Sequence, residues 1–328
     1  MTKAPSERLR VVATARSYCA HDGPHQQIVR DAGIELVLAA GDDPLDAAAL
    51  ARVAAAADGM ILGLDRCDAS VFAAAPRLRA IARYGVGTDS VDLDAARRHG
   101  VTVTNTPGAN TTAVAELTLA LILALARDLP AAVNAARAGH WQRTRGWELA
   151  GKTLGLIGLG QIGRAVAERA RCFGMTVVGH DPHAPAPAGV EQLELAALWP
   201  RSDVISLHLG LDATTRHLID AAVIAQCKST AVIVNTARGG LVDELALADA
   251  LRTGRLAAAA ADAFEHEPPG DSPLLALPNF LATPHLGATT REATQRMGVA
   301  AATDVVAVLT GGRARHVVVQ PATPRRSA

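Results

Sequence analysis

A strand, a glycine-rich turn and a helix follow one another at residues 154–164, and this segment constrains the fold more than any other. The apolar residues 154–157 predict a buried strand, after which Gly158, Gly160 and Gly163 lead into a helix. In that context GxGxxG is the phosphate-binding turn of a dinucleotide-binding βαβ unit. Gly158 permits a tight turn, Gly160 lets the backbone approach a diphosphate, and Gly163 allows close packing of helix and strand. The N-terminus of the helix would then bind the diphosphate.

An acidic residue stands where such a unit binds the ribose of its cofactor. Asp181 follows the next predicted strand, 18 residues after Gly163. An acidic side chain near this distance accepts hydrogen bonds from the adenosine ribose. A carboxylate also repels a 2′-phosphate, and no Arg follows in Pro182-His183-Ala184. The sequence therefore predicts NAD, and not NADP, as the cofactor.

Short apolar strands alternate with helices along most of the chain, which predicts parallel sheets covered on both faces. In the first part, strands are expected at 9–13, 34–38, 60–64, 78–84 and 101–104, and helices at 24–32, 44–57, 70–75 and 93–99. A long apolar helix at 112–126 leads to a second series of strands at 153–158, 175–179, 204–207, 231–235, 258–263 and 280–283. A helix at 288–309 and a strand at 317–319 come last.

The two long helices bracket the second series, so we expect the chain to leave its first domain and return to it. The expected fold class is α/β, with two open, doubly wound parallel-sheet domains: a Rossmann cofactor domain inserted in a flavodoxin-like substrate domain. The expected substrate (catalytic) domain comprises residues 1–104 and 288–320. The NAD-binding domain comprises 105–287, and 321–328 form a disordered tail.

Composition argues against several function classes. Among 328 residues, 32 Lys plus Arg balance 32 Asp plus Glu, whereas a general binder of nucleic acid or anionic membranes needs a basic excess. The most apolar stretch, 117–126, is shorter than the roughly 20 residues of a membrane span. The four cysteines are dispersed and the first residues lack an apolar signal segment. We therefore expect a reduced, cytoplasmic protein without a metal site.

Three polar segments, 235–244, 262–269 and 283–289, follow later strands of the second series. In open α/β sheets, ligands bind at the carboxyl ends of the strands. Arg238 can hold a substrate carboxylate there and polarise the neighbouring oxygen. His285 can give a proton to a carbonyl oxygen and take it back. Glu267 can bind the other imidazole nitrogen and favour the protonated ring. Together these three groups could reduce a carbonyl reversibly.

These three segments and the loop 82–92 resemble the D-isomer-specific 2-hydroxyacid dehydrogenase family, most closely its phosphoglycerate dehydrogenase branch. The similarity extends from about Met60 to Gly312. The resemblance implies that Arg238, Glu267 and His285 are catalytic. It also implies an NAD-dependent oxidoreductase acting on the CH–OH group of a small anionic 2-hydroxy or 2-keto acid.

The resemblance further implies binding residues and a partner. Cofactor contacts are expected at Gly158, Gly160, Gln161, Ile162, Gly163, Asp181, His208, Leu209, Thr236, Ala237, Asp262 and Gly287, with Asp262 on the nicotinamide side. Substrate contacts are expected at Tyr84, Gly85, Val86 and Arg238, where backbone N–H groups of residues 85–87 hold the substrate carboxylate. Residues 139–141 resemble a segment that packs near a dimer partner, which implies a homodimer with each active site in a cleft between the domains.

Two departures from the family pattern leave the substrate open. Leu62 stands where phosphoglycerate dehydrogenases carry a phosphate-binding Arg, and Arg66 is flanked by Asp65 and Asp68, which would weaken phosphate binding. The chain also ends soon after Gly312, without the regulatory domain that many phosphoglycerate dehydrogenases carry. 3-Phosphoglycerate is thus one candidate substrate, and a glyoxylate or hydroxypyruvate reductase activity is the alternative. An NAD(H)-sensing, corepressor-like interaction protein would retain the same motifs.

Overall fold

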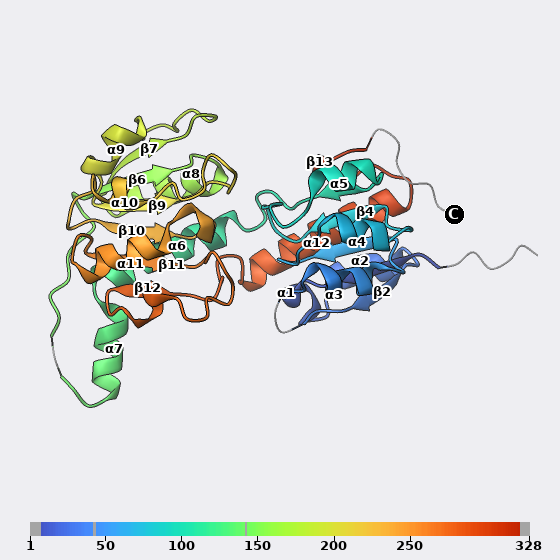
Figure 1. Cartoon of the computed structure of the whole chain (residues 1–328), viewed down its shortest axis with the longest axis horizontal. Coiled ribbons are helices and arrows are strands. Elements are labelled where there is room, and N and C mark those ends of the chain that lie inside the picture. The colour runs from blue at the N-terminus through green and yellow to red at the C-terminus, as the bar shows by residue number, and fades with distance from the viewer. Residues whose placement is uncertain (1–7, 42–43, 142, 322–328) are drawn as a thin grey trace, which may run out of the picture. The chain divides into compact units, whose positions relative to one another are not determined.

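The computed structural model describes residues 8–41, 44–141 and 143–321, and Figure 1 shows its helices and strands. The chain divides into two compact units. Unit 1 comprises the residues up to Asn110 and those from Ala288 on, and unit 2 comprises Thr111–Gly287. Apart from residue 321, the predicted tail lies outside the described residues.

Among its described residues, unit 1 contains a six-stranded sheet in the order β13-β5-β4-β3-β1-β2. Strands β1 to β5 pair in parallel, whereas β13 runs antiparallel to β5. The strands are β1 (Arg10–Ala13), β2 (Glu35–Leu38), β3 (Gly59–Leu62), β4 (Ala80–Arg83), β5 (Thr102–Thr104) and β13 (Val317–Val319). The helices are α1 (Arg16–Cys19), α2 (Pro24–Asp31), α3 (Ala47–Ala54), α4 (Ala69–Ala74), α5 (Leu93–Arg98) and α12 (Arg291–Leu309).

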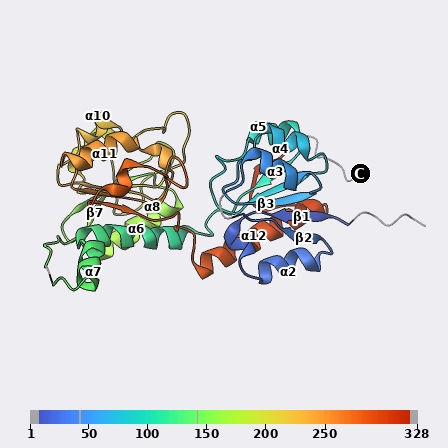
Figure 2. The same cartoon turned by 60° about the horizontal axis from the view of Figure 1, so that its bottom comes forward.

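Alternate strand residues of unit 1 belong to two hydrophobic clusters, one on each face of the sheet. Val12 and Met60 pack with residues of α3, α4 and α5, whereas Val11 and Ile61 pack with residues of α1, α2 and α12. Figure 2 shows these two groups of helices on opposite sides of the sheet. Strands β1 and β3 are therefore apolar on both sides, as expected for a parallel sheet covered on both faces.

Unit 2 contains, within the described part of the chain, a seven-stranded parallel sheet in the order β12-β11-β10-β9-β6-β7-β8. The strands are β6 (Thr153–Ile157), β7 (Thr176–His180), β8 (Glu191–Gln192), β9 (Val204–Leu207), β10 (Val232–Asn235), β11 (Ala258–Ala261) and β12 (Phe280–Ala282). The helices are α6 (Thr111–Ala126), α7 (Leu129–Arg137), α8 (Gln161–Cys172), α9 (Leu195–Arg201), α10 (Ala221–Ile224) and α11 (Glu244–Arg252), with 3₁₀ turns η1 (Gly239–Leu241) and η2 (Pro273–Ala276). The strand order reverses direction beside β6, which is where dinucleotides bind in this class of sheet.

The two faces of the unit 2 sheet are also buried by different helices. Leu154 and Leu156 pack with residues of α6 and α8, whereas Ile205 and Ile233 pack with residues of α9, α10 and α11. The predicted fold class, two doubly wound α/β domains of the Rossmann type, is thereby confirmed.

Two elements of unit 2 were not expected from the sequence. Strand β8 has only two residues, both exposed, so it lacks a hydrophobic pattern. Helix α7 begins at Leu129 with Pro130 in its first turn, and none of its described residues is buried. Its large apolar residues, Leu129 and Val133, lie one turn apart and are exposed, so they add nothing to the core of unit 2.

The division between the units differs from the predicted boundary after residue 104. Residues beyond Thr104 still hydrogen bond within unit 1: the amide of Asn105 donates to the carbonyl of His316, and the amide of Thr106 to that of Gly85. The side chain of Arg296 also donates to the carbonyl of Ala109 over 2.8 Å. These bonds hold the connecting segment to unit 1 as far as Asn110.

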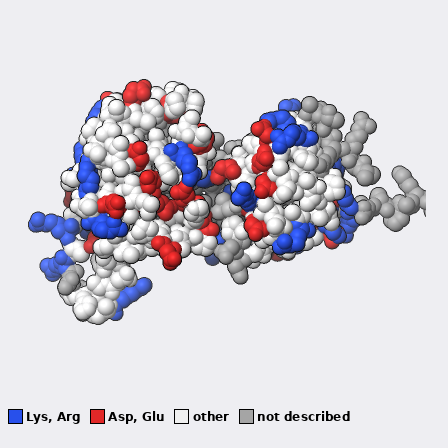
Figure 3. Space-filling view, viewed as in Figure 1, with Lys and Arg blue, Asp and Glu red and all other residues white. Residues whose placement is uncertain are grey.

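Acidic and basic side chains are interspersed on the face of each unit seen in Figure 3. Within the described ranges, His, Cys, Asp and Glu side chains nowhere form a group of three or more that could hold a metal ion. Among the same residues, no helix combines the length and apolar character that a membrane span requires.

Candidate active site

Two glycines shape the turn between β6 and α8. Gly158 has a φ of 95°, and a Cβ there would stand 2.4 Å from the carbonyl oxygen of His208. A Cβ on Gly163 would stand 2.1 Å from the carbonyl oxygen of Gly158. A larger side chain at Gly158 would therefore push the turn away from the segment after β9, and one at Gly163 would push α8 away from the end of β6.

The first turn of α8 has the properties of an anion site. Gly160 occupies the N-cap position without a capping side chain, and no protein atom lies within 4 Å of where its Cβ would be. Gln161 is exposed and Ile162 is half-buried. A helix N-terminus with open space before it suits a diphosphate, so these residues fit the predicted dinucleotide.

Asp181 lies directly after β7 and binds the glycine turn. Its Oδ2 accepts a hydrogen bond from the amide of Leu159 over 2.8 Å, and its Oδ1 accepts from the amides of His183 and Ala184. Burial acts to raise the pKa of Asp181, but the three amides outweigh it and hold the pKa below its usual range. The carboxylate is therefore ionised, and it retains acceptor capacity for a ribose hydroxyl.

The residues after β9 border the same turn. A Cβ on Gly158 would lie 3.1 Å from the amide nitrogen of Leu209. The imidazole Nε2 of His208 lies 2.9 Å from Oγ of Ser206. Burial lowers the pKa of His208 to about 3, so this ring is neutral at physiological pH. Both predicted cofactor residues lie beside the glycine turn.

Asn235 organises the loop that carries Arg238. Its Oδ1 accepts from the amide of Ala237 over 3.0 Å, and its Nδ2 donates to the carbonyl of Arg238 over 2.8 Å. The hydroxyl of Thr236 lies 2.9 Å from that of Thr118 in α6. Asn235 was not among the expected site residues. Its position as a buried polar residue at a strand end is the signal that could have identified it.

The loop after Arg238 packs closely against the segment after β11. A Cβ on Gly239 would lie 1.8 Å from the carbonyl carbon of Phe264 and 2.1 Å from the amide nitrogen of Glu265. Only glycine allows this approach. It brings Arg238 near enough to Glu267 for the guanidinium to contribute to the lowered pKa of that carboxyl.

Glu267 and His285 form a hydrogen-bonded pair. Nδ1 of His285 lies 2.9 Å from both carboxylate oxygens of Glu267, and Oε1 also accepts from the amide of Phe264 over 3.0 Å. Burial acts to raise the pKa of Glu267, but His285, the Phe264 amide and Arg238 together lower it. The structure thus brings the three predicted catalytic residues together, and Nε2 of His285 stays available for a substrate.

Asp262 holds the backbone on both sides of His285. Its Oδ1 accepts from the hydroxyl of Thr283 and the amide of Leu286, and its Oδ2 accepts from the amide of Gly287. Burial raises the pKa of Asp262 despite these bonds. His285 itself has a φ of 52°, in the left-handed region that few side chains adopt. Asp262, expected as a cofactor residue, therefore also fixes the loop of the acid–base pair.

The predicted substrate residues of unit 1 lie just after β4. The hydroxyl of Tyr84 donates to the carbonyl of Thr294 over 3.0 Å, so its side chain belongs to the core. The amide of Gly85 donates to the hydroxyl of Thr106, and this bond competes with the expected one to a substrate carboxylate. Val86 is 40% exposed, so its side chain, unlike that of Tyr84, reaches the surface.

Near the region expected to bind a phosphate, only one of the two acidic residues that flank Arg66 in the sequence interacts with it. Leu62 is fully buried in β3, and Nε of the exposed Arg66 lies 3.7 Å from a carboxylate oxygen of Asp68. Asp65 is buried and accepts hydrogen bonds from the hydroxyl of Thr14 and two backbone amides. Asp68, but not Asp65, therefore competes for Arg66.

Comparison with known proteins places this geometry in context. A family model described as D-isomer specific 2-hydroxyacid dehydrogenase, NAD binding domain, matches residues 119–287. The D-3-phosphoglycerate dehydrogenase of Methanocaldococcus jannaschii is 47% identical over 258 residues, which make up 76% of this chain and 49% of that protein. The chain spans about half the length of the curated relatives it matches.

Two crystal structures resemble nearly the whole chain. A protein from Thermus thermophilus has a TM-score of 0.88 and 42% sequence identity, covering 95% of this chain and 100% of that one. A glyoxylate reductase from Paecilomyes thermophila has a TM-score of 0.84 and 29% identity, covering 95% and 98%.

The close approach of Gly239 yields a first prediction. Replacing Gly239 by Ala should lower the free energy of unfolding by about 1–3 kcal/mol, because the new methyl group overlaps the backbone at Phe264. Urea denaturation measures the loss. Gly210→Ala is the matched control for stability, since a Cβ there meets no atom within 4 Å. Equal stability of the two variants would show that the contact is not tight.

Proposed function

Since this chain belongs to the D-isomer specific 2-hydroxyacid dehydrogenase family, and residues 119–287 match its NAD-binding domain, we propose that it is an NAD-dependent dehydrogenase of a small D-2-hydroxy acid. The observation that carries the proposal is the Glu267–His285 pair next to Arg238. All three follow parallel strands, so they lie at the same edge of the sheet as the glycine turn.

Each residue has a distinct part in the proposed reaction. Bound NAD would accept a hydride from C2 of the hydroxy acid, or return it to the keto acid as NADH. Arg238 would hold the substrate carboxylate and polarise the oxygen on C2. Nε2 of His285 would take the hydroxyl proton in oxidation and give it back in reduction. Glu267, bound to Nδ1, would fix the ring and stabilise its positive charge.

The cofactor residues favour NAD over NADP. The ionised carboxylate of Asp181 stands at the end of β7 and is bonded to the glycine turn. At this place a negative charge accepts hydrogen bonds from ribose hydroxyls and repels a 2′-phosphate. Gly160 and the first turn of α8 would receive the diphosphate, and His208 and Leu209 would border it.

Two substrate groups are compatible with the proposal. Curated relatives named D-3-phosphoglycerate dehydrogenase make 3-phosphoglycerate the first candidate. The buried Leu62 and the Arg66–Asp68 pair leave few charges for a phosphate near β3, which favours glyoxylate or hydroxypyruvate. A panel that adds glycerate and lactate to these three compounds would rank the two groups directly.

The role of His285 yields the main test. His285→Asn should lower kcat on the best substrate of the panel by about 10²- to 10⁴-fold, because the proton donor is lost, while the dissociation constant for NADH changes little. Asn is chosen because it tolerates the positive φ at this position. His266→Asn is the matched control and should keep full activity. His266 is exposed and directly precedes Glu267 in the sequence.

Two outcomes would contradict the proposal. Normal turnover by His285→Asn would remove His285 from the mechanism. Tight NADH binding by the unaltered protein without turnover of any 2-hydroxy or 2-keto acid would favour an NAD(H)-sensing interaction protein.

The carboxylate of Glu267 should determine how kcat/KM for reduction depends on pH. Its pKa lies below the ordinary value of 4.5, so it stays ionised at the pH of an assay. Protonation of Glu267 would remove the acceptor for Nδ1 of His285, so kcat/KM for reduction should fall only as the pH drops below that ordinary value. Glu267→Gln has no carboxylate to protonate, so it should have a lower kcat/KM and lack this fall at low pH.

Glu265→Gln is the matched control for this change, since Glu265 pairs with Arg216 and His217 instead of His285. Its pH profile for reduction should follow that of the unaltered protein. A Glu267→Gln profile with the same kcat/KM and the same low-pH limb would contradict the assigned role.

We further propose that the protein is a cytoplasmic homodimer in which α7 and the following segment contact a second copy. Leu129 and Val133 of α7 are 54% and 39% exposed, and Trp141 is 88% exposed. Exposed apolar residues gathered on one segment indicate an interaction surface. The described cysteines are free thiols, in keeping with a reducing compartment. Thiols that become disulfide-linked in the native protein from cells would contradict this location.

Removal of Trp141 should weaken the dimer. Trp141→Ser is expected to raise the dimer dissociation constant about tenfold or more, since buried aromatic residues dominate interfaces. Sedimentation equilibrium measures it, with Phe173→Ser, at a partly exposed residue just after α8, as the control. A monomeric unaltered protein, or an unchanged constant in Trp141→Ser, would overturn this assignment.

A further inference from the structure

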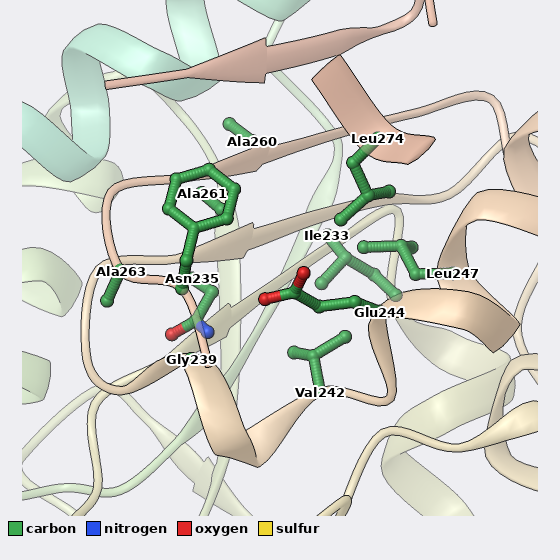
Figure 4. Close-up of a pocket in the computed structure, with 11 residues that line it drawn as sticks. Ile233, Asn235, Gly239, Val242, Glu244, Leu247, Ala260, Ala261, Ala263 and Leu274 are labelled. Atoms are coloured by element: carbon green, nitrogen blue, oxygen red, sulfur yellow. The ribbon is translucent and has the colours of Figure 1, made fainter. Parts of the chain in front are cut away.

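Glu244 is the first residue of α11, yet its side chain does not cap that helix. Asp243 is the N-cap, and its Oδ1 accepts from the amides of Leu245 and Ala246. Figure 4 shows the Glu244 carboxylate pointing into a small pocket, with Leu274 and Val242 on either side. A carboxylate among apolar side chains loses hydration, so it needs hydrogen-bond donors there.

The donors come from the segment that carries Glu267. Oε1 of Glu244 accepts from the amide of Glu265 over 2.8 Å, and Oε2 accepts from the hydroxyl of Ser272 over 3.2 Å. The preceding amide, that of Phe264, donates to Glu267 itself. Two successive amides of this segment are therefore held by two carboxylates, one from α11 and one from the acid–base pair.

These bonds connect two separate parts of the site. Arg238 and Glu244 belong to the stretch from β10 to α11, whereas Glu267 belongs to the stretch after β11. Gly239 lies against the peptide between Phe264 and Glu265 without a side chain to lock it. The hydrogen bond that the Glu265 amide donates to Glu244 is directional, so it can fix the orientation of this peptide, which the contact with Gly239 alone does not.

We propose that Glu244 is a positioning residue of the acid–base pair: it fixes the peptide at Glu265 so that Glu267 keeps His285 aligned with Arg238. This inference rests on the proposed function for its catalytic consequence, but the alignment itself concerns only the Glu267–His285 bond. Glu244 touches neither the substrate nor the proton that His285 transfers.

Three substitutions separate the bond from the charge. Glu244→Ala removes the acceptor for the Glu265 amide and should lower kcat about 10- to 100-fold, the usual effect of residues that orient a catalytic group, with KM changed less than threefold. Glu244→Gln keeps a carbonyl oxygen in place of Oε1 and should retain at least a third of kcat. Glu244→Asp keeps the charge but withdraws it by one methylene, and should lower kcat like Ala.

A second readout does not require turnover. The ¹⁵N chemical shift of Nδ1 in His285 reports its hydrogen bond to Glu267, and it can be measured in the protein without cofactor. Glu244→Ala and Glu244→Asp should move this resonance, whereas Glu244→Gln should not. Glu194→Ala is the matched control, because Glu194 also lies at the start of a helix but its side chain makes no capping bond.

The outcomes distinguish the two proposals. If the unaltered protein turns over no substrate, the proposed function fails, while the Nδ1 resonance still tests the positioning role. An unchanged resonance and unchanged kcat in Glu244→Ala would overturn that role, as would equal losses in Glu244→Ala and Glu244→Gln. If Glu244→Ala does not fold, Glu244→Asp takes its place, and normal behaviour of that variant would overturn the inference.

Discussion

Parallel strand pairing in unit 2 is the constraint on which the site depends. Because β6, β7, β9, β10, β11 and β12 run in one direction, their carboxyl ends meet along one edge. The glycine turn, Asp181, Arg238 and His285 each follow one of these ends. The sheet itself thus brings together residues that are far apart in the chain. The short loops after the strands then only have to orient their side chains.

At the amino ends of their strands, both sheets contain the same kind of hydrogen-bonded carboxylate. Asp58, just before β3, accepts from the amide of Arg10 and pairs with Arg77. Asp203, just before β9, accepts from the amide of Thr153 and pairs with Lys228. In both units a carboxylate thus joins the starts of two adjacent strands and pairs with a cation. Such partly buried bonds stabilise the sheet, so the other edge can carry loops shaped for binding.

The apolar strands could be predicted because burial on both faces leaves a continuous hydrophobic pattern. The strand ends then indicated Arg238, Glu267 and His285. Sequence patterns could not show that the Glu244 carboxylate binds the amide of Glu265. They also could not show that the amide of Gly85 donates to the hydroxyl of Thr106. Both depend on backbone amides of distant segments, whose positions no local pattern contains. Helix α7, which is shorter and less apolar than α6, was not predicted either.

Carboxylates bound to backbone amides recur wherever a loop of this site must hold a definite shape. Asp181 fixes the glycine turn, Asp262 brackets the left-handed backbone at His285, and Glu244 holds the peptide before Glu267. An amide donor is part of the main chain, so a carboxylate bound to it fixes the loop itself and leaves neighbouring side chains free. That separation explains how one edge can keep Arg238 and His285 in place while neighbouring side chains of unit 2 remain free for other contacts.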